Sequence, residues 1–529
     1  MKNNIRSEAK SNPNVIPANR LCQKSRENNK KINQLISIWH DAHDILYHIQ
    51  KERYMPIKYG DRYQLLLLPP SIEEYVAEDD VVRAYDTFVD LLDWGKLYFT
   101  TSESNMGRPK YDPKTMLKML LYSYSYGIRS SRKIERACYH NLSFIWLTGG
   151  LKPDHKTIAE FRRNNKKSLK NVFKQCVRFC IKCDLIEGNV LFVDGTKIRA
   201  NASIKNTYTK DKCTKILSKI DKRIDELLAE CETIDQEEAD QRSHVKLKKE
   251  LSDKQALHAK IQSVMEELKN ENIKSKNTTD PDCSNMRSTQ GAHASHNVQQ
   301  VVDDKNGLIV HVDTTNENND SQQFANQIEQ ADEAVDNKCK VACGDAGYAN
   351  TDELKKIDDK QIKVIVPSQK QALHKKPKPL NRDEFTYDSK NDQYICPKGN
   401  RLTYRGLNKQ KRAKVYHITD AKLCHRCQYF GVCTKSDVGR KLARLIDEKY
   451  KQKFENQYLE PGSQQIYKRR KEKVEHPFGH IKRNLKVDAF LLRGCDGTIA
   501  EMSLLATCFN ITRMISLLGM TGLMAQKAV

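Results

Sequence analysis

Between Asn189 and Ser368 the order of apolar and amphipathic segments restricts the folds that are open to this chain. The run LFV predicts a first strand that ends at Asp194. The segments NVQQVVDD and GLIVHVDT, joined by the turn at 304–307, predict a β-hairpin. A helix is expected over SQQFANQIEQADEAV, and KVACGD and QIKVIVPS predict two further strands. This order of strand, hairpin, helix, strand, helix and strand predicts a mixed α/β sheet of the ribonuclease-H-like type.

Three acidic residues lie at notable positions: two at the ends of expected strands and one among the basic residues of an expected helix. Asp194 ends the first strand, Asp345 ends the fourth, and Glu475 lies in an expected helix, KVEHPFGHIKR. Carboxylates can converge on Mg²⁺, which prefers oxygen ligands, and two such ions about 3.5–4 Å apart support phosphoryl transfer. We therefore expect a metal-dependent enzyme that cuts nucleic-acid strands. The alternative is that all three are ordinary solvated carboxylates at the ends of strands and helices.

The charge balance indicates a polyanionic partner. Lys and Arg number 91 against 68 Asp and Glu, which gives a formal net charge of +23 and a pI near 9.2. Such a surface attracts phosphate polyanions. The first sixty residues lack the apolar run of a signal peptide, and no segment approaches the ~18 uncharged apolar residues of a membrane span. We therefore expect a soluble intracellular protein whose 16 cysteines are reduced.

The region 59–185 has the pattern of short helices joined by tight turns. Asp112 and Asp154 are helix-start signals, and Gly127 and Gly149 are stops. We expect a helix-turn-helix bundle that binds DNA; the alternative is a solvated bundle with charged outer faces. The residues predicted to contact DNA here are Arg129, Arg132, Arg136 and Arg162.

Two insertions are expected to interrupt the α/β domain. In 205–276, two series of apolar residues at alternating spacings of three and four predict an antiparallel helical hairpin that turns at DQEEADQRSH. A single frayed helix is the alternative, but it would leave one apolar stripe exposed. In 371–440, Lys, Arg, Tyr and Cys replace the apolar strands.

The second insertion carries cysteines with the spacing of a metal site. Four cysteines from two parts of the segment, including one C-x₂-C turn, match the ligand set of a tetrahedral Zn²⁺ site. Such a metal would fold a segment that is too polar to build its own core. The expected ligands are Cys396, Cys424, Cys427 and Cys433. His417 or His425 could replace one of them, and free surface thiols remain the alternative. By contrast, Cys176, Cys180 and Cys183 fall on one helix face and are expected in the core.

The linked motifs resemble the DDE transposases of bacterial insertion sequences, in the group whose third acidic residue lies in a Tyr-Arg-Glu-Lys signature. The similarity extends over nearly all of Tyr59–Arg513 and includes GRPKYDPKTMLKMLLYSYSYG, FVDGTKIRANAS, CGDAGY and VEHPFGHIKR. It implies a ribonuclease-H-like core, Asp194, Asp345 and Glu475 as the catalytic triad, and Mg²⁺ or Mn²⁺ as their metal. It also implies action on double-stranded DNA, at the terminal inverted repeats and the target, by a homodimer in the bacterial cytoplasm at the nucleoid, without membrane contact.

The sequence departs from the family signature at two positions. The family places two, three and six residues between its Tyr, Arg, Glu and Lys. Glu475 and Lys482 keep the last interval, but Tyr467 and Arg470 each stand one residue early, so strict spacing would put the basic position at Lys471. Lys482 and Arg470 are predicted to contact DNA, and the shift leaves the roles of Arg470 and Tyr467 open.

These observations predict a five-part organisation. The expected parts are a basic arm and helix at 1–58, the helical DNA-binding domain at 59–185, a catalytic domain at 186–204, 295–370 and 441–529, the hairpin insertion at 205–276 and the Cys-rich insertion at 371–440. The predicted function is a transposase that binds terminal inverted repeats and cuts and transfers DNA strands. The alternatives are a catalytically inactive DNA-binding relative that acts as a repressor, and a structure-specific nuclease with a similar core.

Overall fold

The computed structural model describes residues 71–99, 110–237, 241–273, 275–288, 291–373, 379–410 and 412–525. The basic arm and helix predicted at 1–58 lie outside these ranges, as do residues 238–240 of the segment DQEEADQRSH, where the hairpin is predicted to turn.

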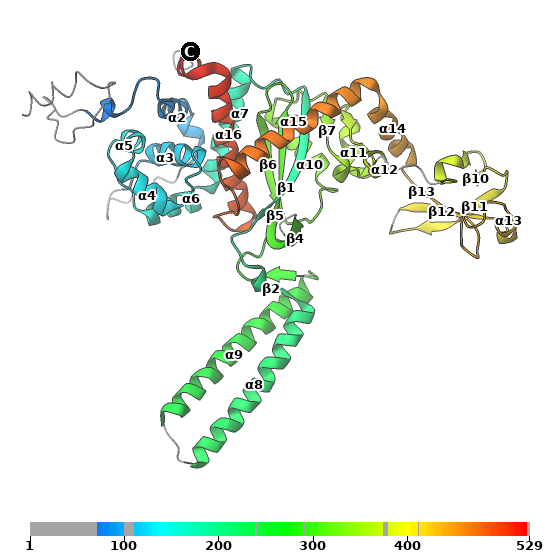
Figure 1. Ribbon diagram of the computed structural model, residues 1–529, viewed down its shortest axis with the longest axis horizontal. Coiled ribbons are helices and arrows are strands. Elements are labelled where there is room, and N and C mark those ends of the chain that lie inside the picture. The colour runs from blue at the N-terminus through cyan, green and yellow to red at the C-terminus, as the bar shows by residue number, and fades with distance from the viewer. Residues whose placement is uncertain are drawn as a thin grey trace, which may run out of the picture. The chain divides into compact units, whose positions relative to one another are not determined.

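A mixed sheet occupies the centre of the described chain, in the order β4-β5-β1-β7-β8, with β6 also paired to β5 (Figure 1). β1, β7 and β8 are parallel, and β5 runs antiparallel to β1, β4 and β6. The strands are β1 (Val190–Arg199), β4 (Ser284–Ser288), β5 (Gly291–Asp303), β6 (Ile309–Thr315), β7 (Val341–Cys343) and β8 (Lys363–Ile365). The predicted mixed α/β sheet and the β5–β6 hairpin are confirmed, whereas β4 was not expected.

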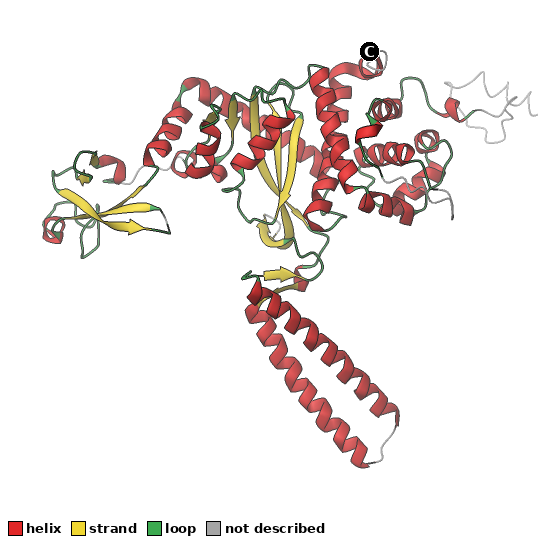
Figure 2. Cartoon of the chain, turned by 180° about the vertical axis from the view of Figure 1, so that it is seen from behind, coloured by secondary structure: helices red, strands yellow, loops and turns green. Residues whose placement is uncertain are grey.

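Helices cover both faces of this sheet (Figure 2). α10 (Phe324–Ala334) packs on β1, β5 and β6, and α15 (Pro461–Arg483) packs on β1, β5 and β7. α11 (Thr351–Asp358) and α14 (Glu448–Leu459) pack against β8. α10 and α15 therefore bring different side chains to the two faces of β1.

The N-terminal described region is helical, as the sequence predicts. Its helices are α2 (Val81–Asp90), α3 (Pro113–Ser125), α4 (Ser131–His140), α5 (Leu142–Leu147), α6 (His155–Asn164) and α7 (Lys166–Lys182). The Asp112 carboxylate caps α3 by accepting from the Thr115 N–H, and Asp154 caps α6 by accepting from the N–H groups of Lys156 and Thr157. Cys176 and Cys180 are fully buried on α7, and Cys183 is partly buried, so this cysteine series belongs to the core.

The last long helix, α16 (Gly494–Ala525), ties the helical region to the sheet. It packs against α2, α3, α7 and β6, and the Asn510 side chain exchanges hydrogen bonds of 2.9 and 2.8 Å with the backbone of Ile309 on β6. Among the described residues, its segment Gly494–Met520 is long and apolar enough to cross a membrane, with 61% of its most apolar window buried. The segment contains Asp496, Glu501 and Arg513, so it is not a run of uncharged residues. The helix is apolar on most sides because protein surrounds it.

A helical hairpin leaves the sheet between β1 and β4 (Figure 1). α8 (Lys210–Glu237) and α9 (Gln241–Asn270) lie side by side, with Cys213, Ile261 and Leu268 buried near their base. β2 (Thr207–Thr209) and β3 (Ser275–Asn277) pair antiparallel and close that base. The heptad-like spacing thus places its apolar residues between two helices, where neither helix could bury them alone.

The Cys-rich segment forms its own antiparallel sheet in the order β13-β12-β11-β10-β9. The strands are β9 (Thr386–Asp388), β10 (Gln393–Ile395), β11 (Arg401–Asn408), β12 (Ala413–Ile418) and β13 (Lys441–Leu445). Its small core contains Phe385, Tyr394, Leu402, Tyr416, Ile418 and Leu442. The sheet extends to Leu445, five residues past the predicted boundary at 440, because β13 completes it by pairing with β12.

Candidate active site

Asp194 lies inside β1, which corrects the prediction that it ends the strand. β1 pairs with β7 only through Val190, Leu191 and Phe192, and then continues to Arg199 beside β5, with one isolated bridge from Arg199 to Ala489. Past Phe192, the β7 side of β1 therefore has no strand partner among the described residues. β7 ends at Cys343, and Asp345 turns into the short 3₁₀ helix η4 (Ala346–Tyr348), where its carboxylate accepts from the Gly347 N–H at 2.8 Å.

A third aspartate that the sequence reasoning missed lies beside the first two. Asp320, in the loop between β6 and α10, accepts hydrogen bonds from the Asn297 amide at 2.7 Å and the Gln299 amide at 2.6 Å. A Cβ atom on Gly195 would stand 2.7 Å from the Asp320 carboxylate, so only glycine permits this approach. We call Asp194, Asp320 and Asp345 the carboxylate cluster.

The carboxylates of the cluster repel one another. The pKa of Asp194 is raised from its ordinary value to about 6, first because the side chain is buried and then because the Asp345 and Asp320 carboxylates are close; Arg470 opposes the rise. The Tyr348 hydroxyl donates to the Gln299 side-chain Oε1 atom at 2.5 Å, which orients the Gln299 Nε2 atom to donate to Asp320. Such a group of acids favours a cation.

α15 supplies that cation on the face of β1 to which Asp194 points. The Arg470 Nη1 atom lies 3.7 Å from the Asp194 Oδ1 atom, and its guanidinium lies 5.5 Å from the centre of the Tyr467 ring. The Lys482 Nζ atom donates to the Thr196 hydroxyl at 2.5 Å, and burial lowers the pKa of Lys482 while Asp194 opposes that shift. Tyr467, Arg470 and Lys482 therefore all lie on the side of α15 that meets the site, although the first two stand one residue early.

Glu475 stays apart from the two aspartates with which it was grouped. It is exposed on α15, next to the buried Val474, whose carbonyl accepts from the Gln300 amide at 3.3 Å. No contact between Glu475 and Asp194 or Asp345 is present in the described chain. Nor, within those residues, is any set of three or more His, Cys, Asp or Glu arranged to hold a metal ion. The structure thus brings two of the three predicted acids together and adds Asp320.

Two of the arginines predicted to contact DNA are internal, which corrects that prediction. Arg129 is 8% exposed, and its guanidinium contacts Glu501 at 2.5 Å and the carbonyls of Lys486 and Ala489. Arg162 is also buried, and it donates to the Tyr124 hydroxyl, the Arg129 carbonyl and the Ser131 hydroxyl. Both guanidinium groups are therefore bonded inside the protein and are not available to a DNA phosphate.

The other two arginines are accessible. Arg132 and Arg136 are exposed on α4, together with Lys133. Arg132 and Arg136 are four residues apart, which places them on one side of the helix. This exposed face of α4 therefore keeps the cations that a phosphate backbone could meet.

The four cysteines of the Cys-rich sheet line one small cavity with about 30 Å³ of free space. Burial raises the pKa of the Cys433 thiol, and the neighbouring thiols of Cys424, Cys396 and Cys427 raise it further, against the effect of Arg440. The C-x₂-C turn is closed by the Cys427 N–H, which donates to the Cys424 carbonyl at 3.1 Å. The thiols thus face a common space without being arranged as a formed metal site in the described residues.

Comparison with known proteins identifies two regions of the chain. Residues 70–164 match the model of a transposase domain of the family DUF772, and residues 395–515 match the model of a transposase DDE domain. The first match spans the helices α2–α6. The second runs from the Cys-rich sheet through α15 to α16. No curated protein and no solved structure matches the chain.

Proposed function

The chain belongs to the DDE transposases of insertion sequences, and from that premise we propose that it binds the terminal inverted repeats of its element and cuts and joins DNA strands at the carboxylate cluster. The observation that carries this proposal is the meeting of Asp194 and Asp345 at the open edge of β1, inside a basic protein. The strand order, with β1 at the centre between antiparallel β5 and parallel β7, is consistent with a ribonuclease-H-like core.

The donor chemistry of the cluster fits a divalent metal such as Mg²⁺ or Mn²⁺. Asp194 and Asp345 present oxygen ligands without a soft donor. The pKa of Asp194 is raised first by burial and then by the neighbouring carboxylates, and a bound cation would oppose both effects. When bound, such ions activate a hydroxyl nucleophile and stabilise the leaving oxygen. Glu475, which is exposed on α15, is the third ligand that we propose. It would have to approach the cluster when DNA and metal are present.

The protein's own side chains position the strand. Lys482 and Arg470 present cations to the side of β1 that faces α15, where they would hold a phosphate next to Asp194. Arg132 and Arg136 on α4 offer a second, separate contact to the DNA backbone. In this proposal α4 holds an element end while the cluster cuts the strand. The proposed active form is a homodimer in the cytoplasm, with one element end per subunit.

We also propose that Cys396, Cys424, Cys427 and Cys433 hold one structural Zn²⁺. All four line one cavity, and the sheet around it has only a small apolar core, so a metal would supply much of its folding free energy.

End cleavage tests the proposal. The DNA that flanks the gene should contain imperfect inverted repeats, and a duplex with one of these ends should be cut at the element boundary in Mg²⁺ or Mn²⁺. An Asp345→Asn variant should bind that duplex without cutting it. Binding by the wild-type chain without any cleavage would instead favour an inactive relative that acts as a repressor, and cleavage that follows DNA shape irrespective of the end sequence would favour a nuclease.

A further inference from the structure

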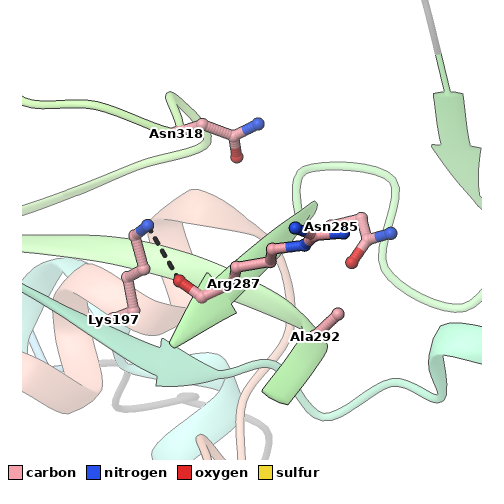
Figure 3. Close-up of a pocket in the computed structure, with 5 residues that line it drawn as sticks. All are labelled: Lys197, Asn285, Arg287, Ala292 and Asn318. Atoms are coloured by element: carbon pink, nitrogen blue, oxygen red, sulfur yellow. Dashed lines mark hydrogen bonds between the residues drawn. The ribbon is translucent and has the colours of Figure 1, made fainter. Parts of the chain in front are cut away.

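Figure 3 shows the side chains around a cationic cavity of about 420 Å³ at the end of the sheet where β1 meets β5. It is lined by Lys197, Asn285, Arg287, Ala292 and Asn318, from β1, β4, β5 and the loop after β6. Neither the predicted triad nor the predicted DNA contacts include any of them. A cavity of this size can hold a molecule as large as a nucleotide.

The cavity shares a wall with the cluster. Lys197 lies directly opposite Asn297 in the β1–β5 register, and the Asn297 amide donates to Asp320 at 2.7 Å. Asn318 stands two residues before Asp320 in the same loop. Side chains paired across two strands lie about 5 Å apart, so a ligand beside Lys197 would lie next to the amide that holds Asp320.

The two cations of the cavity are not neutralised by carboxylates. The Lys197 Nζ atom donates to the Arg287 carbonyl at 3.1 Å (Figure 3), and in the described part of the chain neither Lys197 nor the Arg287 guanidinium forms an ion pair. Arg287, Asn285 and Asn318 are exposed. Two unpaired cations with two amides match a phosphodiester, which offers charge and hydrogen-bond acceptors together.

The cavity lies on the other face of β1 from Lys482. Thr196 and Asp194 point to the α15 face, where Lys482 and Arg470 contact them, whereas Gly195 and Lys197 point to the α10 face. A strand held at the cluster could therefore continue from one cationic surface to the other. We infer that the Lys197–Arg287 cavity binds the backbone phosphate of a nucleotide adjacent to the cut bond. This inference rests on the proposed function.

The test combines a protein variant with a chemical change in the DNA. A fluorescent element-end duplex carries a single neutral methylphosphonate at one of several positions around the cut, and its binding is measured by anisotropy in metal-free buffer, where no strand is cut. In the wild-type chain one position should weaken binding about tenfold. Lys197→Gln/Arg287→Gln should weaken binding to unmodified DNA about as much, lower the salt slope by about one to two, and show no further loss at that position.

Lys340→Gln is the matched control, because Lys340 is an exposed cation at the opposite end of β7. It should retain the wild-type affinity and the wild-type response to every methylphosphonate. Thermal melting verifies that each variant is folded, and the single variants Lys197→Gln and Arg287→Gln repeat the measurement with less change.

A folded double variant with the wild-type affinity and the wild-type methylphosphonate profile overturns the inference. If it does so while the wild-type chain cuts element ends, the proposed function stands and the cavity alone is rejected. If the wild-type chain neither binds nor cuts such DNA, the proposed function fails and the inference fails with it.

Discussion

The Arg470 guanidinium lies 3.7 Å from the Asp194 carboxylate, so a side chain of α15 supplies positive charge where a catalytic cation is expected. The arginine is largely buried, at 14% side-chain exposure, and the Asp194 and Tyr467 side chains raise its pKa against the effect of burial. Its contact with Asp194 opposes the repulsion that Asp345 and Asp320 create. Arg470 therefore acts on the same carboxylate that the proposed metal ion would use.

Arg470→Gln should lower the melting temperature at neutral pH by a few degrees, because the cluster then lacks its cation. Millimolar Mg²⁺ should restore more of this loss in the variant than it adds to the wild type. Arg470→Lys keeps the charge and serves as the control. Melting curves with and without Mg²⁺ measure both effects, and an equal response to Mg²⁺ in all three proteins would contradict this account of Arg470.

Stability should depend on pH through Asp194. Its pKa in the folded protein, about 6, is higher than the ordinary 3.8, so the folded state binds the proton more tightly than the unfolded state. The stabilisation is complete below pH 3.8 and is lost as the pH rises through 6. At pH 7.5 the buried charge of Asp194 lowers the free energy of unfolding by at most about 3 kcal/mol, and Asp194→Asn removes that charge. The variant should therefore melt at a higher temperature than the wild type at pH 7.5.

That difference should shrink toward pH 4, which a series of melting curves from pH 4 to 8 would show. Asp383→Asn is a matched control, because Asp383 is an exposed aspartate remote in sequence from β1. A gain for Asp194→Asn that is independent of pH would mean that its carboxyl does not titrate in this range.

Glu475→Gln should abolish end cleavage while leaving DNA affinity within about twofold, if Glu475 joins the metal ligands when DNA binds. Asp345→Asn should behave in the same way. Glu472→Gln, at another exposed glutamate of α15, is the control and should cut normally. Near wild-type cleavage by Glu475→Gln would remove it from the catalytic set and leave Asp320 as the candidate third acid.

Arg129→Met should destabilise the fold without a specific effect on DNA. Removing one partner of a buried ion pair typically costs about 3–5 kcal/mol, because the other charge stays buried, here Glu501 at 1% side-chain exposure. The double variant Arg129→Met/Glu501→Leu should recover part of that loss. Arg136→Gln should show the reverse pattern, with unchanged melting and weaker DNA binding that is most evident at low salt.

The purified chain should contain about one Zn per molecule. Cys424→Ser/Cys427→Ser should lose it, and proteolysis should then cut within 379–445, because the remaining core is small. Cys183→Ser, in α7, should keep the metal. Elemental analysis with limited proteolysis measures both, and a metal-free wild-type chain with a protease-resistant Cys-rich sheet would defeat the zinc proposal.

The sequence predicted the sheet and the helices well where their patterns are local. The apolar runs before Asp194 and Asp345 and the turn at 304–307 are readable without tertiary information. The buried state of Arg129 is not, because its partner Glu501 lies 372 positions away and the helix pattern alone shows only a charged residue near a helix start. Exposure of an arginine depends on which surfaces pack on it.

Asp320 was missed for a similar reason. It does not directly follow a strand and lies among polar loop residues. Only its hydrogen bonds to amides of β5 and its close approach to Gly195 identify it as part of the site. Residues 297–300, in the stretch NVQQ, were a usable signal, since amides inside an apolar strand call for a buried acceptor. The position of Glu475 relative to the aspartates depends on how α15 is rotated about its axis. The sequence could not define that rotation, because Tyr467 and Arg470 stand one residue away from the family spacing.

The Thr278 N–H donates to the Asn206 carbonyl at 3.0 Å, where β2 and β3 close the base of the helical hairpin. The chain therefore returns to the point from which it left, and nothing in the sheet depends on how far it travels in between. Evolution could lengthen or shorten this excursion by whole helical turns at little cost to the sheet. A short glycine-rich link between Asn206 and Thr278 should accordingly give a smaller protein that still folds.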